Sequence, residues 1–141
     1  MPRMFLFLIA AAVLFARPAL AADLAVEVRN IQPGPGNVVL HLWNSAETFR
    51  DEEKAVAMQS VPADAATVLV TFKDLEPGHY ALIGYHDEDG NGKMNRFMGM
   101  IPTEGYCVSN NPSLAGPPKF DISSFPVGAP HPEETVLEMK Y

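Results

Sequence analysis

The sequence predicts an all-β protein, an antiparallel β-sandwich of the Ig-like or transthyretin-like kind, with about seven strands and one long irregular loop region. Two observations lead to this prediction. Apolar and polar residues alternate with a period of two along several short segments. Turn clusters rich in proline and glycine, such as the Pro-Gly-Pro-Gly of residues 33–36, separate these segments.

Five segments have the pattern of strands. In the first, Leu24, Val26 and Val28 alternate with more polar neighbours, which is typical of a strand buried on one face. The segment 38–43 is apolar at nearly every position, so we expect it to be buried on both faces and not to form an edge. The expected strands are 24–28, 38–43, 67–72, 80–86 and 135–141.

Two regions are less regular. Residues 45–58 fit either a short helix that begins with Ser45 as N-cap or a looped edge, and the sequence leaves both open. Residues 99–133 contain seven prolines and form an unusually long loop for one domain. Within it, 120–122 and 125–127 are expected to attach the loop to the core, as a short edge strand.

The N-terminal residues 1–21 have the layout of a secretory signal peptide. Arg3 precedes an apolar run over residues 4–15, and Ala19-Leu20-Ala21 forms an A-x-A cleavage site. We expect cleavage after Ala21, a single β-sandwich domain over 22–141, and a periplasmic or secreted location. The apolar run is shorter than the roughly 20 residues that a spanning helix needs, so no membrane span is expected after cleavage.

The charge of the mature chain limits its partners. Without Arg3 and Arg17 it carries 8 basic and 17 acidic side chains, a balance of −9. Nucleic acids and anionic membrane surfaces both require a basic footprint, so neither is expected as a partner. A glycan or protein partner is left open. The single cysteine, Cys107, excludes an internal disulfide, and the fold must depend on its core or on a metal.

The segment 86–95 is the clearest candidate for chemistry. Oxygen-bearing side chains alternate along it, and Gly92 falls where a tight loop must bend, as in the first half of an EF-hand calcium loop. Position twelve of such a loop is Met98 instead of a bidentate Glu. We predict a weak structural Ca²⁺ site, with a solvated turn as the alternative. Its predicted ligands are Asp87, Asp89, Asn91, the Lys93 carbonyl, Asn95 and, folding back from the following loop, Glu104.

Other kinds of site have less support. Mg²⁺ demands an octahedral shell that suits a loose loop poorly, and the four histidines lack the close pairing of zinc ligands. Cys107, His86 and an Asp could be assembled into a catalytic set, but no sequence signature surrounds them. We therefore expect no enzymatic activity. The alternative function is a carbohydrate- or peptide-binding module that uses the 95–120 loop.

Several motifs in order resemble a bacterial secreted family known as domain of unknown function 2141 (DUF2141). The resemblance implies a single extracytoplasmic β-sandwich, similar to transthyretin-like or carboxypeptidase regulatory domains, and no established activity. Asn95 stands where Asp is common in that family, and Cys107 where Gly is usual. The motifs are Gly78-His79-Tyr80-Ala81, His86 to Lys93, Gly99 to Gly105, Ser109-Asn110-Asn111 and Pro118-Lys119-Phe120.

Overall fold

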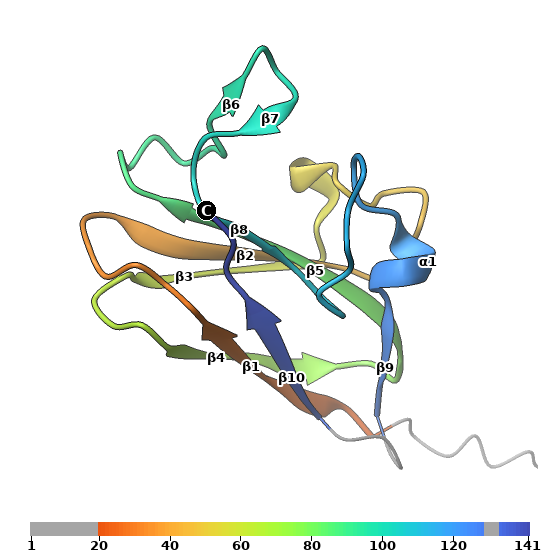
Figure 1. The fold of residues 1–141 in the computed structure, drawn as a ribbon. Helices are drawn as coiled ribbons and strands as arrows, with labels where there is room; N and C mark the ends of the chain where they lie inside the picture. The colour runs from red at the N-terminus through yellow and green to blue at the C-terminus, as the bar shows by residue number, and fades with distance from the viewer. Residues whose placement is uncertain (1–19, 129–132) are drawn as a thin grey trace, which may run out of the picture.

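The computed structural model describes residues 20–128 and 133–141, and its fold is a β-sandwich with one short helix (Figure 1). The all-β prediction is confirmed. The described residues form ten strands, more than the expected seven, because residues 96–127 contribute four strands of two or three residues. The strands are β1 (Ala22–Arg29), β2 (Asn37–Trp43), β3 (Ala57–Pro62), β4 (Val68–Leu75), β5 (Gly78–Asp87), β6 (Arg96–Phe97), β7 (Ile101–Pro102), β8 (Tyr106–Val108), β9 (Phe125–Val127) and β10 (Glu134–Glu138).

Two sheets form the sandwich, and a small hairpin stands apart from them. The first sheet has the order β10-β1-β4, in which β1 is parallel to β10 and antiparallel to β4. The second has the order β3-β2-β5-β8 and is antiparallel, and β9 pairs with the beginning of β5. β6 and β7 form a separate two-stranded hairpin, which projects from the top of the molecule in Figure 1.

The core lies between the two sheets and is built from alternate residues of each strand. Leu24, Val26 and Val28 of β1 have no exposed surface, as their alternation predicted. The second sheet meets them with the apolar face of β2 and β5. Phe72 and Tyr80 belong to the same cluster, with Val38, Leu40, Leu42, Val70, Leu82, Leu137 and Met139.

The outer face of β2 is also buried, as its continuous apolar pattern predicted. His41 stacks on Trp43 with ring centroids 5.8 Å apart, and on Tyr85 of β5 at 6.1 Å. Phe49 packs edge-on against Trp43 and also against Phe120. Two loops thus cover this face with an aromatic layer, and β2 and β5 are central strands with both faces packed.

Of the two alternatives for residues 45–58, the short helix is wrong and the looped edge is confirmed. The chain turns through 46–50, makes a single 3₁₀ turn, η1 (Glu52–Lys54), and then enters β3. The Trp43 Nε1–H donates to the Asp51 carbonyl at 2.9 Å. This bond ties the segment to the end of β2, and pairing with β2 then fixes residues from Ala57 onward as a strand.

The long loop region attaches to the body near its end. Residues 120–122 lie in α1 (Phe120–Ser123), a single helical turn and not a strand, whereas the expected edge strand at 125–127 is β9. β10 ends at Glu138, before the end of the predicted strand. The predicted signal segment 1–21 lies outside the described residues apart from its last two. No helix in the described ranges is long and apolar enough to cross a membrane.

Candidate functional site

The acidic loop begins where β5 leaves its neighbour β2. Asp87 is the last residue of β5 and pairs with Asn37, the first residue of β2. Gly36 precedes that pair with a φ of 83°, and a Cβ placed on it would overlap the Asp87 carbonyl oxygen. Only glycine fits this close approach of two backbones. The start of the loop is therefore held by a rigid strand pair.

The loop wraps around the Asp87 carboxylate, which accepts hydrogen bonds from its backbone. Asp87 is 4 % exposed. Its Oδ1 accepts the Asn91 N–H at 3.1 Å, and its Oδ2 accepts the Gly92 N–H at 2.9 Å. Gly90 and Gly92 have φ values of 71° and 73°, which glycine adopts readily. The loop's glycines thus bring backbone donors to a buried carboxylate.

Asp89 lies across the loop from Asp87 and is exposed. Its Oδ2 accepts hydrogen bonds from the Asn95 Nδ2 at 2.7 Å and from the Asn91 Nδ2 at 3.1 Å. The bond from Asn95, with the backbone N–H of Asn91, lowers the pKa of Asp89. The Asp89 carboxylate is therefore held in its ionised form.

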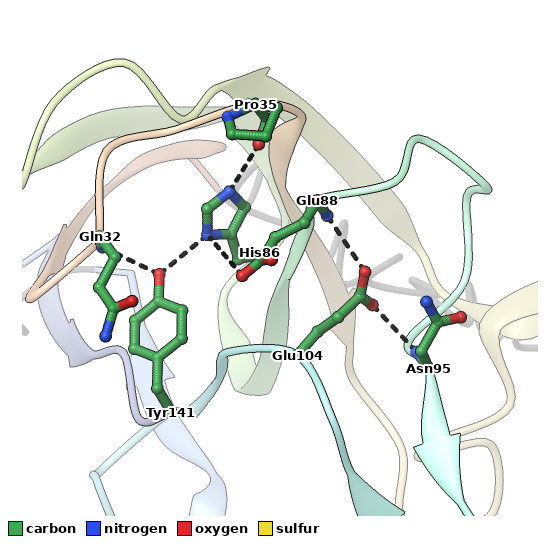
Figure 2. A network of polar contacts seen from close by, with 7 residues as sticks. All are labelled: Gln32, Pro35, His86, Glu88, Asn95, Glu104 and Tyr141. Carbon is green, nitrogen blue, oxygen red and sulfur yellow. Dashed lines mark hydrogen bonds and ion pairs between the residues drawn. The ribbon is translucent and has the colours of Figure 1, made fainter.

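Glu104 closes the loop from the segment that returns from the β6–β7 hairpin (Figure 2). It is 7 % exposed, its Oε1 accepts the Glu88 N–H at 3.1 Å, and its Oε2 accepts the Asn95 N–H at 3.0 Å. One carboxylate thus joins both ends of the loop. Met98, at the position of the EF-hand glutamate, is instead an exposed residue of the hairpin.

Three carboxylates converge at this site without a cationic side chain. Oxygens of Asp87, Asp89 and Glu104 lie within 4.8 Å of one another. In the described part of the chain, no Lys, Arg or His nitrogen lies within 4.0 Å of these oxygens. Each carboxylate oxygen has two acceptor positions, so oxygens that accept one N–H keep a lone pair. The group can hold a hard metal ion.

The amide ligands predicted from the sequence lie at the rim of this group. The Asn91 Nδ2 donates to the Asn95 Oδ1 at 2.6 Å, and both amides turn an N–H toward Asp89. Ligation of a cation would require these amides to turn their oxygens inward. Lys93 contributes a backbone N–H to the Asn91 Oδ1 at 2.8 Å. Its carbonyl as a ligand stays a prediction, as do both amide oxygens.

Tyr85 supports the loop from below and was not predicted to belong to the site. Its hydroxyl donates to the Gly92 carbonyl at 3.0 Å. Burial, together with the negative charges of Glu52, Asp87 and Glu104, raises the pKa of Tyr85 to about 12, so the hydroxyl keeps its proton. Residues 85 and 87 lie on the same face of β5 because side chains alternate with a period of two in a strand. This spacing could have predicted from the sequence that Tyr85 lies next to Asp87.

His86 and Tyr141 form a polar network behind the loop (Figure 2). His86 is 1 % exposed, and its Nε2 lies 2.9 Å from the Pro35 carbonyl, which can only accept. Nε2 therefore donates to Pro35, and Nδ1 lies 2.9 Å from the Tyr141 hydroxyl and 3.8 Å from a Glu88 carboxylate oxygen. That hydroxyl accepts the Gln32 N–H at 3.0 Å. Both ring nitrogens of His86 thus have partners within the fold, so His86 has a structural role.

Cys107 lies in β8 opposite Gly84, away from the acidic loop. The Gly84 position has no room for a side chain beside the Cys107 Sγ and Leu40. Burial raises the pKa of the Cys107 thiol to about 12. The thiolate, which is the nucleophilic form, is therefore negligible at neutral pH.

A second feature lies beyond the Trp43 end of β2. An open hollow of about 320 Å³ separates the 46–50 turn from the start of α1. Phe49 and Phe120 supply aromatic walls, with ring centroids 5.7 Å apart, and Arg50, Lys119 and Asp121 supply charges. Residues 118–120 belong to the loop that the sequence assigned to a carbohydrate or peptide ligand.

The fold and the site define a class of protein: a β-sandwich domain with a carboxylate-lined loop at one end. The chain belongs to the DUF2141 family, described as uncharacterized proteins conserved in bacteria, which it matches over residues 26–135. The resemblance noted in the sequence is therefore confirmed. Comparison with curated proteins and with solved structures gave no match.

Proposed function

We propose that this protein is a non-enzymatic periplasmic or secreted module whose 87–95 loop binds Ca²⁺ weakly, with the ion acting as a structural clip. The observation that carries the proposal is the group of Asp87, Asp89 and Glu104, three carboxylates with no cationic partner in the described residues. Two of them are buried, and buried charges need a partner or a metal.

The donor set favours Ca²⁺ over other common ions. Ca²⁺ takes six to eight oxygen ligands in a flexible shell. Three carboxylates supply up to six oxygens, and the Asn91 and Asn95 amides, the Lys93 carbonyl and water can complete the shell. No nitrogen or sulfur ligand belongs to the group, which disfavours zinc. A loop with three carboxylates and no bidentate Glu at position twelve should bind with a Kd on the order of 10⁻⁴ to 10⁻³ M, as in extracellular modules.

The proposed role follows from what Glu104 joins. Its carboxylate accepts hydrogen bonds from both ends of the loop, at Glu88 and Asn95, and so connects the loop to the segment between β7 and β8. An ion shared by Asp87, Asp89 and Glu104 would remove the repulsion among them and strengthen the same connection. It would thereby substitute for the disulfide that a chain with one cysteine lacks.

Thermal unfolding with and without the ion tests this function. At a Ca²⁺ concentration ten times Kd, binding to the folded state adds about 1.4 kcal/mol to the free energy of unfolding. For a domain of this size that raises Tm by roughly 5 °C. A chelator should reverse the rise, and Mg²⁺ at equal concentration should give a smaller one.

A charge-neutral variant and a matched control locate the effect. Asp89→Asn should abolish the Ca²⁺-dependent rise in Tm while leaving the Tm in chelator within a degree or two, because Asp89 is exposed. Asp64→Asn removes an equally exposed carboxylate outside the loop and should retain the full rise. If Ca²⁺ leaves the Tm of the parent protein unchanged, or if both variants respond alike, the proposed function is wrong.

The hollow beside Phe120 supports a second candidate, a carbohydrate- or peptide-binding module. Aromatic walls with a few charged groups are typical of sites for small ligands. Binding to a glycan array that Phe120→Ala abolishes would favour this function. An array without a hit, together with the Ca²⁺-dependent rise in Tm, would favour the first.

A further inference from the structure

The hairpin of β6 and β7 collects exposed apolar side chains at the loop end of the molecule. We call residues 96–102 the apolar hairpin. Phe97 and Ile101 are each 60 % exposed, and Met98 and Met100 are each 77 % exposed. Ten large hydrophobic side chains are exposed in the described residues, and these four fall within five consecutive positions. Single exposed apolar residues are ordinary, whereas a contiguous group marks an interaction surface.

The shape of the apolar hairpin limits what it can contact. It projects beyond the ends of both sheets as a narrow tip (Figure 1). Its backbone is paired within itself on both sides of the turn, where Arg96 pairs with Pro102, Phe97 pairs with Ile101, and the Met100 N–H donates to the Phe97 carbonyl at 3.2 Å. A paired backbone is what a segment needs in order to enter an apolar phase.

Strand addition by another protein chain is poorly supported at this hairpin. β6 and β7 have two residues each, and Pro102 has no N–H to donate. Met98, next to Gly99, has a φ of 51°, a backbone conformation that side chains other than glycine rarely adopt. The turn therefore holds a large apolar side chain at the tip and leaves no regular edge for a partner strand.

The charges around the apolar hairpin differ from those of the whole chain. Between residues 90 and 103 there is no acidic residue, and both Lys93 and Arg96 are exposed. The whole chain carries a net charge of −7. Acidic residues flank this stretch on both sides, Asp87, Glu88 and Asp89 before it and Glu104 after it, and Glu88 and Asp89 are exposed. The tip formed by residues 90–103 itself carries only cationic charges beside its apolar side chains, which is complementary to anionic headgroups above acyl chains.

We propose that the apolar hairpin inserts into the headgroup–acyl boundary of a bilayer that contains anionic phospholipid. Phe97, Met98, Met100 and Ile101 would enter among the upper acyl carbons, and Lys93 and Arg96 would contact lipid phosphates. The total charge of the chain argued against an anionic surface, but the cationic tip, not the average, would meet the lipid. This attachment is interfacial and does not span the bilayer. It is independent of the Ca²⁺ site, so it is tested in the presence of a chelator.

A fluorescent variant and vesicles test the proposal. In a Phe97→Trp protein the new indole is exposed, whereas Trp43 is 1 % exposed and reports a constant background. With vesicles of phosphatidylethanolamine and phosphatidylglycerol, we expect a blue shift of the emission and quenching by lipids brominated high on the acyl chain. Vesicles of phosphatidylcholine alone should bind at least about threefold more weakly, because they offer no net negative charge.

Matched variants locate the contact. Phe97→Ser/Ile101→Ser should weaken co-sedimentation with anionic vesicles by at least about tenfold, since two large apolar side chains no longer leave water. Leu69→Ser removes a side chain that is 73 % exposed on β4 and should bind like the parent. Circular dichroism and Tm should match the parent for both, because all three side chains are exposed.

Three results would overturn the proposal. The first is a parent protein that fails to co-sediment with anionic vesicles. The second is an equal loss of binding in Leu69→Ser and in Phe97→Ser/Ile101→Ser. The third is a blue shift of the Phe97→Trp protein that depends on protein concentration without vesicles, accompanied by a dimer in sedimentation velocity. That result would assign the apolar hairpin to self-association.

Discussion

Gly36 shows how one residue sets the geometry of the acidic loop. Its φ of 83° and its overlap with the Asp87 carbonyl leave no place for a Cβ, whereas Gly90 has a similar φ of 71° and open space around it. Substituting each glycine by alanine therefore distinguishes the free-energy cost of a steric overlap from the cost of a positive φ. Both costs apply at Gly36, and only the second applies at Gly90.

We expect Gly36→Ala to lower the free energy of unfolding by roughly 3 kcal/mol, from overpacking and the unfavourable φ together. Gly90→Ala should lower it by about 1 kcal/mol, from the φ alone. Urea unfolding of both variants in chelator measures the difference. Equal losses would show that the close approach of the residue-36 and residue-87 backbones is not maintained in solution.

At the scale of elements, the short segment after β10 joins the two sheets at the back of the loop. Lys140 bridges to Tyr106 of β8, and the Tyr141 hydroxyl bonds to His86 at the end of β5. The Tyr141 ring also occupies the space beside Gly105, where a Cβ would overlap it. These contacts fasten the loop-bearing ends of β5 and β8 to the first sheet.

Tyr141→Phe tests this fastening by removing one hydroxyl and leaving the ring in place. The Nδ1 of His86 and the Gln32 N–H would both lose a partner, and we expect the free energy of unfolding to fall by about 1 to 2 kcal/mol. Denaturant unfolding measures the loss. As a control, Tyr106→Phe changes a tyrosine of β8 whose hydroxyl makes no hydrogen bond in the described residues, and it should stay within about 0.5 kcal/mol of the parent.

Strands were predicted correctly where buried and exposed residues alternate along the chain. They were missed where pairing with another strand determines the conformation. The segments 24–28, 38–43, 67–72 and 80–86 correspond to β1, β2, β4 and β5 because period-two patterning reports directly on faces. β3 was not predicted as a strand. Its burial pattern lacks a clear inner face, and its conformation comes from pairing with β2. Local sequence carries little information about such an edge.

The sequence predicted the three carboxylates of the candidate site. It did not predict the residues and elements that hold those carboxylates in place. Asp87 and Asp89 follow from their spacing, and Glu104 follows from the missing glutamate at position twelve. Glu104 reaches the loop because the β6–β7 hairpin reverses the chain between Asn95 and Glu104, and the sequence did not predict this hairpin. Tyr141 is far from the loop in sequence, and the pairing of β10 with β1 and of Lys140 with Tyr106 brings it to His86. Contacts of this range have no local pattern.

At the scale of the whole molecule, the single cysteine leaves stability to the core. Cys107 is 1 % exposed and its thiol pKa is about 12. A thiol with so little exposed surface is not accessible to the thiol of a second chain. We therefore expect one Tm with and without reductant, and a monomer band on a non-reducing gel after exposure to air. A disulfide-linked dimer under native conditions would contradict the buried position.

The central place of β1 in its sheet has a consequence for how the chain folds. β1 lies between β4 and β10, and Asn30, the residue after β1, donates to the Met139 carbonyl across a sequence separation of 109 residues. Closing a loop of this length costs conformational entropy before the stabilising contacts can form, and this slows folding. β1 can pair with β4 earlier, but its sheet is incomplete until β10 has been made. A chain exported through the proposed secretory route would therefore be unable to complete its sandwich before the whole domain has been synthesised.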